Sequence, residues 1–156
     1  MSSFPDRCVS TRSDKVVVKK ENGREFRLQN KNRANVRIVA IDTCLIPRDR
    51  KRCDWGFWLD GTEGPDQSAA DRAWLVELKG SNLSAALQQI LSTLAFIEIS
   101  HPEEINSRKI VAVVVLSRFS APKLKTDPRY VKLKKYKKTI DAVIIKNGVV
   151  ELNTDE

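Results

Sequence analysis

A continuous apolar run over residues 110–116 is the feature that most constrains how this chain can fold. The run is dominated by Val and contains no polar residue, so a strand formed here has no polar face to present to water. We therefore expect a strand buried on both faces within an α/β domain. The run is far shorter than the roughly 20 residues of a membrane span, so no membrane-spanning segment is expected.

Length and composition indicate a single folded domain with an anionic partner. The chain has 156 residues without an internal repeat or linker, which predicts one domain over residues 1–156. Hydrophobic residues make up 41%, enough to exclude a disordered chain. The net charge of +8 favours a polyanionic partner, most often nucleic acid.

Turn signals predict a hairpin near each end of the chain. Asn22-Gly23 separates the strand-like segments 16–20 and 24–29. Asn147-Gly148 likewise separates segments 141–146 and 149–152.

The central part of the sequence predicts strands followed by one well-marked helix. The expected strands cover residues 35–46, 53–59 and 73–79. Apolar residues then recur at helical spacing, with Ser81 or Asn82 as the cap, and the helix should end before His101, which precedes a proline. A second, short helix is expected over residues 129–138.

The three cysteines, Cys8, Cys44 and Cys53, have no CxxC spacing. Their odd number argues against a disulfide framework, and their spacing against a zinc ribbon. We expect three small buried thiols instead. Because the first residues also lack the apolar core of a signal peptide, a reducing cytoplasm is the expected location.

Charge is unevenly distributed along the chain. Residues 1–40 and 109–156 each carry a net +6, whereas residues 41–108 carry −4. A site that holds divalent cations and faces polyphosphate would have this distribution, and so would carboxylates that merely cluster in one loop.

Two basic clusters are candidate phosphate contacts, with a solvated surface as the alternative. One lies within the run 123–138 and is interleaved with tyrosines; the other directly precedes Asp54. The candidate nucleic-acid-binding residues are Lys132, Lys134, Lys135, Lys137 and Lys138 in the first cluster, and Arg48, Arg50, Lys51 and Arg52 in the second.

A carboxylate and a lysine share one face of the expected strand 73–79. Side chains alternate along a strand, so Glu77 and Lys79 point to the same side. If the strand 53–59 pairs antiparallel with it, with Leu59 near Trp74, then Asp54 lies near Lys79. Two carboxylates and a lysine at one point suit metal-assisted hydrolysis of a phosphodiester. The alternative is a buried ion pair between Glu77 and Lys79.

The order Asp54, Glu77-Leu78-Lys79, then a helix resembles the PD-(D/E)XK nuclease superfamily. The resemblance implies a restriction-endonuclease-like core with a mixed central sheet in an αβββαβ-type arrangement, extended here by N- and C-terminal hairpins. It also implies Mg²⁺, with Mn²⁺ as a substitute, bound by Asp54, Glu77 and the Leu78 carbonyl. Lys79 would be the catalytic lysine.

Two further positions bear on the resemblance. Gln89-x-x-x-Thr93 is similar to a QxxxY-like pattern on the family's helix, which makes Gln89 a fourth candidate catalytic residue. The sequence departs from the family in having Cys53 where a proline often precedes the aspartate, and in having strand-like segments where an initial helix is usual.

The sequence therefore predicts a Mg²⁺-dependent endonuclease that acts on DNA in preference to RNA, in phage defence, recombination or repair. By the family's habits it would be a homodimer or a subunit of a larger complex. The alternatives are a non-catalytic nucleic-acid-binding module or small subunit on the same fold, and a subunit whose basic face contacts an acidic protein.

Overall fold

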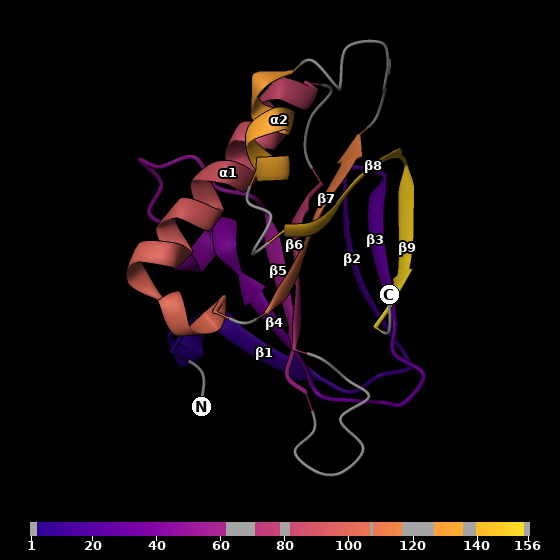
Figure 1. Ribbon diagram of the computed structural model, residues 1–156. Helices are drawn as coiled ribbons and strands as arrows, with labels where there is room; N and C mark the ends of the chain where they lie inside the picture. Colours follow the sequence, from indigo (N-terminus) through magenta and orange to yellow (C-terminus); the bar gives the residue numbers. More distant parts are fainter. Residues whose placement is uncertain are drawn as a thin grey trace.

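The described residues form two β-sheets and two main helices arranged in layers, in the computed structural model shown in Figure 1. The structure describes residues 3–61, 71–78, 82–106, 108–116, 127–135 and 140–154. The larger sheet has the strand order β1-β4-β5-β6-β7-β8, and the smaller sheet has the order β2-β3-β9.

The bounds of these elements are as follows. The larger sheet contains β1 (Val9–Arg12), β4 (Val36–Ala40), β5 (Trp55–Leu59), β6 (Arg72–Glu77), β7 (Lys109–Leu116) and β8 (Ile140–Asn147). The smaller sheet contains β2 (Val16–Glu21), β3 (Arg24–Gln29) and β9 (Val149–Asn153). The helices are α1 (Leu83–Ser100) and α2 (Pro128–Lys135), accompanied by the short turns Asp6–Cys8, Ile41–Leu45 and Pro102–Glu104.

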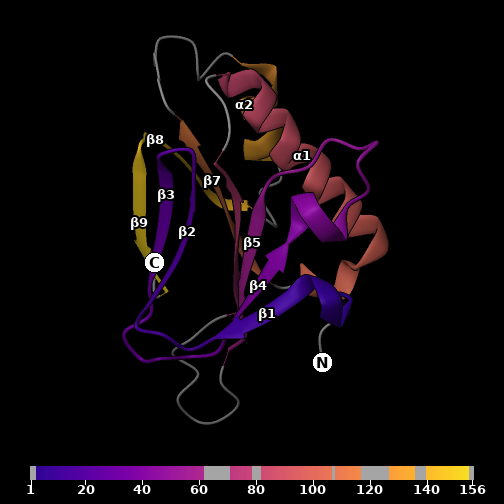
Figure 2. The same ribbon diagram turned by 180° about the vertical axis from the view of Figure 1, so that it is seen from behind.

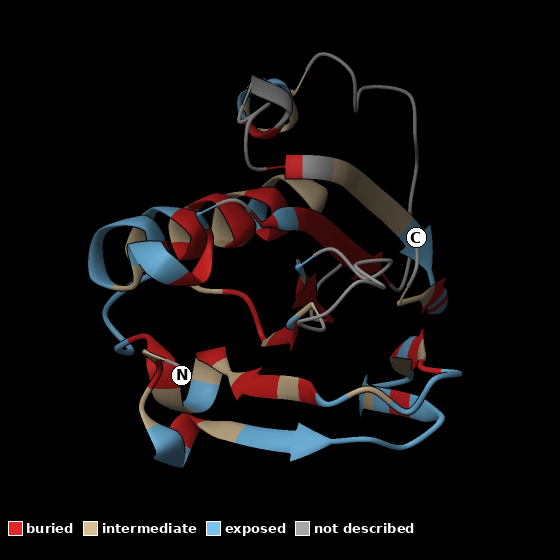
Figure 3. Ribbon diagram, turned by 60° about the horizontal axis from the view of Figure 1, so that its bottom comes forward, coloured by how far each residue is buried: buried red, intermediate tan, exposed pale blue. Residues whose placement is uncertain are grey.

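Each face of the larger sheet is covered. Both views of the ribbon place α1 and α2 on one side of it and the smaller sheet on the other (Figures 1 and 2). Side chains of β7 alternate between the two cores: Ile110, Ala112 and Val114 pack on the helix side, and Val111 and Val113 on the side of the smaller sheet. Figure 3 shows the resulting buried layer. The predicted strand with two buried faces is confirmed.

The larger sheet is mixed, as the resemblance implies. Strands β4, β5 and β6 pair antiparallel in chain order. Helix α1 then leads to β7, which runs parallel to β6, and β8 is parallel to β7. Since β6 and β7 are parallel neighbours, the chain must return across the sheet between them, and α1 makes that crossing.

Helix α1 begins and ends where the sequence predicts. Asn82 caps it, because its side-chain oxygen accepts a hydrogen bond from the Ala85 N–H at 3.2 Å. The helix ends at Ser100, before the His101-Pro102 step. Its length and composition would also suit a membrane span, but the core helix of a soluble protein passes the same test.

Only the first of the two predicted hairpins forms. Asn22 (φ 49°) and Gly23 (φ 77°) join the antiparallel strands β2 and β3. At the other end, β8 and β9 belong to different sheets, so the predicted C-terminal hairpin is wrong. The Gly148 N–H donates to the Leu116 carbonyl at 3.0 Å, while its own carbonyl accepts from Glu25 N at 2.8 Å. Gly148 therefore carries the chain from one sheet to the other.

Two of the three cysteines are joined. Cys8 and Cys44 form a disulfide between residues 36 positions apart, so the prediction of three thiols is wrong for this pair. Cys53 is a buried thiol, as predicted. An odd count is compatible with one bridge and one thiol, and the bridge weakens the argument for a reducing cytoplasm.

An ion network fixes the end of the larger sheet where β5 stops. Arg37 on β4 contacts Glu104 at 2.7 Å and Asp60 at 2.8 Å, and Arg108 contacts Asp60 at 2.8 Å. Partial burial acts to raise the pKa of Asp60, but the hydrogen bonds from the two arginines outweigh it, so this pKa lies below its ordinary value. The network ties β4, β5 and the start of β7 together.

Candidate active site between β5, β6 and α1

The two candidate carboxylates lie at the same end of neighbouring strands. Asp54 directly precedes β5, and Glu77 is the last residue of β6. The side-chain Oδ2 of Asp54 accepts a hydrogen bond from the Leu78 N–H at 2.7 Å, and the Asp54 N–H donates to the Val76 carbonyl at 3.1 Å. Asp54 is 4% exposed and Glu77 is fully buried. The structure thus holds both acids beside each other, away from bulk water.

The register between the two strands differs from the predicted one. Leu59 lies opposite Arg72 rather than near Trp74, a shift of two residues. Because side chains alternate with a period of two, this shift leaves the same side chains on the same face. It brings Asp54 against residues 76–78 instead of beside position 79, which lies outside the described residues.

Glu77 belongs to the face covered by the helices. Its partner on β7 is Val114, which packs in the core on the helix side, as do Ala73 and Leu75 of β6. Burial raises the pKa of the neighbouring Cys53 thiol well above its ordinary value, and the negative charges of Glu77 and Asp54 raise it further. The two acids and the thiol therefore share one electrostatic environment beneath α1.

Backbone contacts from the far side hold Asp54 in place. The strand predicted over residues 35–46 ends at Ala40, where the chain enters the π-helical turn Ile41–Leu45. The Asp54 carbonyl accepts hydrogen bonds from both Ile41 N (3.3 Å) and Asp42 N (3.2 Å) at this point. The disulfide at Cys44 lies within the same turn. Asp54 is thus fixed by β6 on one side and by this turn on the other.

Thr93 links this segment to the helix that carries Gln89. The Cys53 N–H donates to Thr93 Oγ1 at 2.8 Å, and the same hydroxyl donates to the Gln89 carbonyl at 2.8 Å. Thr93 is fully buried, while Gln89 is partly exposed beside the basic loop. Sequence reasoning placed Thr93 only on a polar flank of the helix and missed its contact with Cys53. The only signal for this contact in the sequence was the Gln-x-x-x-Thr spacing.

The Leu78 carbonyl, expected to bind metal, has a protein partner. Arg24 Nη1, from β3 of the smaller sheet, donates to it at 3.2 Å. This arginine was not anticipated, because 54 residues separate it from Leu78. A guanidinium on this oxygen disfavours a second cation there, since the two positive charges repel each other.

Several of the other candidate site residues lie outside the part of the chain that the structure describes. Lys79, Lys137 and Lys138 lie outside the described residues, and for Lys134 and Lys135 the structure describes the helical backbone alone. Lys132 is exposed on α2. Within the described ranges, no three His, Cys, Asp or Glu residues form a group that could hold a metal. A cation site here would rest on the two carboxylates of Asp54 and Glu77, because the Leu78 carbonyl is engaged by Arg24.

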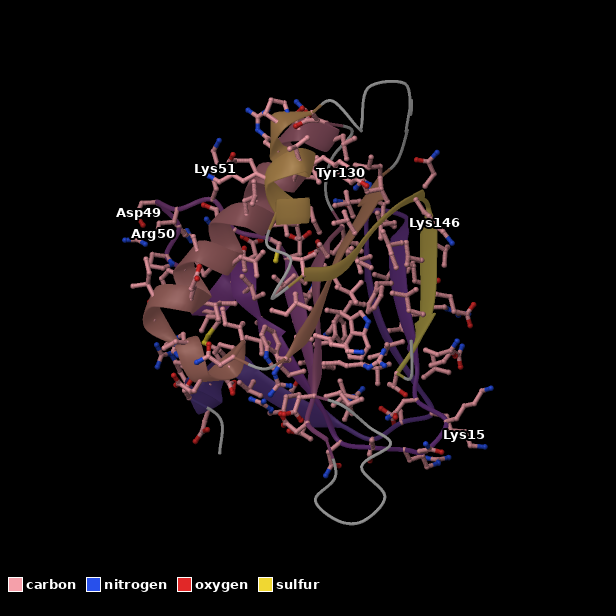
Figure 4. All side chains as sticks on the ribbon, in the orientation of Figure 1. Lys15, Asp49, Arg50, Lys51, Tyr130 and Lys146 are labelled. Atoms are coloured by element: carbon pink, nitrogen blue, oxygen red, sulfur yellow. A yellow bond between two sulfur atoms is a disulfide. The ribbon has the colours of Figure 1, made fainter. Side chains whose placement is uncertain are left out.

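The second basic cluster surrounds a surface hollow. Residues 48–52, together with Asp42 and Gln89, line a volume of about 310 Å³. Arg48, Arg50 and Lys51 are exposed, whereas the Arg52 side chain is only 18% exposed. Figure 4 shows Arg50 and Lys51 at the outer edge of the molecule beside α1.

Comparison with known protein families, with curated proteins and with solved structures finds no match for this chain. The class that the fold defines is a mixed α/β protein in which a six-stranded sheet lies between helices and a second, smaller sheet.

Proposed function

We propose that this protein is a Mg²⁺-dependent nuclease of the PD-(D/E)XK type that hydrolyses phosphodiester bonds of DNA. The observation that carries the proposal is the pair of buried carboxylates, Asp54 and Glu77, at adjoining strand ends under one helix. Carboxylate oxygens are the ligands that a hard divalent cation prefers, and such a cation is commonly held by one or two carboxylates. A cation-binding site accounts for that arrangement.

The order of elements supports the same proposal. Antiparallel β4, β5 and β6, then α1, then parallel β7 correspond to the βββαβ part of the αβββαβ core. Among the described residues before β4, the only helical element is the short turn Asp6–Cys8, so the initial helix of that core has no counterpart there. The smaller sheet would be an addition specific to this chain.

The residues at this point fit a hard divalent cation in part. Asp54 and Glu77 offer the carboxylate oxygens that Mg²⁺ or Mn²⁺ prefers, whereas the Leu78 carbonyl is engaged by Arg24. When bound, Mg²⁺ polarises the phosphoryl oxygen and activates the attacking water. We assign Lys79 to the charge that develops on the phosphate, and Gln89 to orienting the substrate beside the hollow.

The engagement of Leu78 favours one alternative, a non-catalytic nucleic-acid-binding module on this fold. In that case Arg24 would be a permanent substitute for a cation, and the basic residues would bind DNA without metal. For the catalytic form we propose a homodimer or a subunit of a larger assembly, because one site cuts one strand at a time. We also propose a cytoplasmic location, on the ground of the DNA substrate alone, because the Cys8–Cys44 bridge points away from a reducing compartment.

The test is cleavage of supercoiled plasmid by the wild type and by Asp54→Asn and Glu77→Gln, in Mg²⁺ and in EDTA. Asp14→Asn, which alters an exposed carboxylate paired only with Arg12 among the contacts described here, is the matched control. We expect Mg²⁺-dependent nicking by the wild type and the control, and none by the two site variants. DNA binding in EDTA without any cleavage in Mg²⁺ would instead establish the non-catalytic module.

A further inference from the structure

The basic loop of residues 47–52 is built differently from an ordinary solvated surface. A turn closes it, in which the Arg50 N–H donates to the Pro47 carbonyl at 3.1 Å. Its last arginine, Arg52, folds back into the loop instead of extending outward. Arg52 Nη1 donates to the carbonyls of Arg48 (3.1 Å) and Arg50 (2.8 Å).

Arg52 also fixes the loop to the rest of the site. Its Nε lies 2.9 Å from the Asp42 carbonyl and 2.8 Å from the Asp42 carboxylate, in the turn that holds Asp54. The Arg52 guanidinium therefore binds three backbone carbonyls and one carboxylate. Those oxygens would repel a phosphate if they faced the solvent, so their inward orientation removes that repulsion. The outer surface of the loop then carries three exposed cations, Arg48, Arg50 and Lys51, against one exposed carboxylate, Asp49.

The loop is anchored at both ends and along its side. The disulfide between Cys8 and Cys44 secures the turn before it, and the Cys53 hydrogen bond to Thr93 secures the residue after it. Arg50 lies over the ring of Phe96 on α1, with 5.7 Å between the guanidinium carbon and the ring centre. The positive side chains are therefore held by a scaffold that needs little reordering when a ligand binds.

We propose that this loop is a preorganised phosphate-binding site for duplex DNA. In it Arg48, Arg50 and Lys51 contact the phosphates, and Arg52 is a positioning residue that does not touch the ligand. The hollow beside Gln89 would receive the backbone next to the cleaved bond. The choice of DNA as the ligand rests on the proposed function. The inference refines that function, because it assigns Arg52 to positioning the loop and no longer to contacting the phosphates.

The experiment measures binding of a short fluorescein-labelled DNA duplex in EDTA, by anisotropy over a salt series. The variants are Arg48→Ala/Arg50→Ala/Lys51→Ala together and Arg52→Lys, which retains the charge but loses the forked donors. Lys15→Ala is the matched control, because Lys15 is an exposed lysine at the opposite side of the molecule (Figure 4). Circular dichroism melts establish that each variant is folded.

The expected pattern separates contact from positioning. Each lost phosphate contact lowers the slope of log Kd against log salt by about 1, so the triple variant should lose about 3. Arg52→Lys should weaken binding about tenfold with an unchanged slope, since the contacting charges remain but lose their order. Lys15→Ala should match the wild type.

Two results would overturn the inference. A triple variant with the slope of the wild type would show that the loop does not contact phosphate, and an Arg52→Lys variant with the affinity of the wild type would remove its positioning role. Because binding is measured without metal, these results are independent of cleavage. A protein that binds as expected but never cleaves would refute the nuclease and leave the loop assignment intact.

Discussion

Replacing Thr93 by Val tests whether one buried hydroxyl positions the candidate site. Valine has nearly the same shape, so the packing between α1 and the sheet is retained while both 2.8 Å hydrogen bonds are lost. The Gln89 carbonyl keeps its place in the helical hydrogen-bond ladder. The Cys53 N–H, however, is left buried without its acceptor, which costs about 1–3 kcal/mol of unfolding free energy.

The assay combines thermal melting with cleavage kinetics. At this chain length, that loss corresponds to a decrease in Tm of about 2–4 °C per kcal/mol. Displacement of Asp54 relative to Gln89 should lower kcat by about 10–100-fold with little change in the KM for DNA. Thr93→Ser, which keeps the hydroxyl, should restore kcat even where it fails to restore Tm.

Thr43→Val is the matched control, because Thr43 is exposed on the turn Ile41–Leu45 and its hydroxyl is not part of this link. It should leave both Tm and kcat unchanged. Equal kcat values for Thr93→Val and Thr93→Ser would refute the reasoning, since the hydroxyl would then matter only for stability.

Four further outcomes are expected. Mg²⁺ at 100 times its Kd should stabilise the wild type by about 2.7 kcal/mol and leave the melting of Glu77→Gln unchanged, as measured by calorimetry. Glu104→Ala should cost about 1–3 kcal/mol in urea unfolding, because the largely buried Arg37 guanidinium loses this partner and keeps only its contact with Asp60 among those described above. Because the pKa of Asp60 is lowered in the folded state, its contribution to the free energy of unfolding is complete above about pH 4 and is lost as the pH falls through the folded-state pKa. The difference in Tm between the wild type and Asp60→Asn should therefore shrink below pH 4. Reduction of the bridge between Cys8 and Cys44 should cost about 4 kcal/mol by its loop length, measured as a shift in denaturant midpoint.

The antiparallel pairing of β5 with β6 could be predicted from the sequence, and it brings Asp54 and Glu77 to the same end of the two strands, but their register could not be predicted. Alternation breaks beside Asp54, because Cys53 packs in the core on the helix side whereas Trp55 packs on the side of the smaller sheet. The period of two fixes which side chains point the same way, and a shift by two residues preserves that information. Register depends instead on the connection between the strands and on hydrogen bonds such as the one from Leu78 N to Asp54. Those contacts follow from tertiary structure rather than from the pattern of either strand.

The errors have the same origin. The Asn147-Gly148 step turns the chain as predicted, with Gly148 at φ 77°, yet local turn chemistry contains no information on which strands its two sides will join. Here β7 and β3 supply the partners. Similarly, the pairing of Cys8 with Cys44 depends on two turns that are distant in sequence becoming neighbours.

Several contacts that sequence reasoning missed fix the position of the segment around Asp54. Arg24 and Thr93 reach the segment around Asp54 from β3 and α1, and the turn Ile41–Leu45 reaches it from β4. Each makes a hydrogen bond to backbone, so these contacts fix the position of the chain and not only of one side chain. A buried carboxylate in a segment that is held from three elements cannot move into water without breaking those hydrogen bonds. That constraint is costly for a purely structural acid, whereas it is useful at a cation site, where the ligand geometry must exist before the ion arrives.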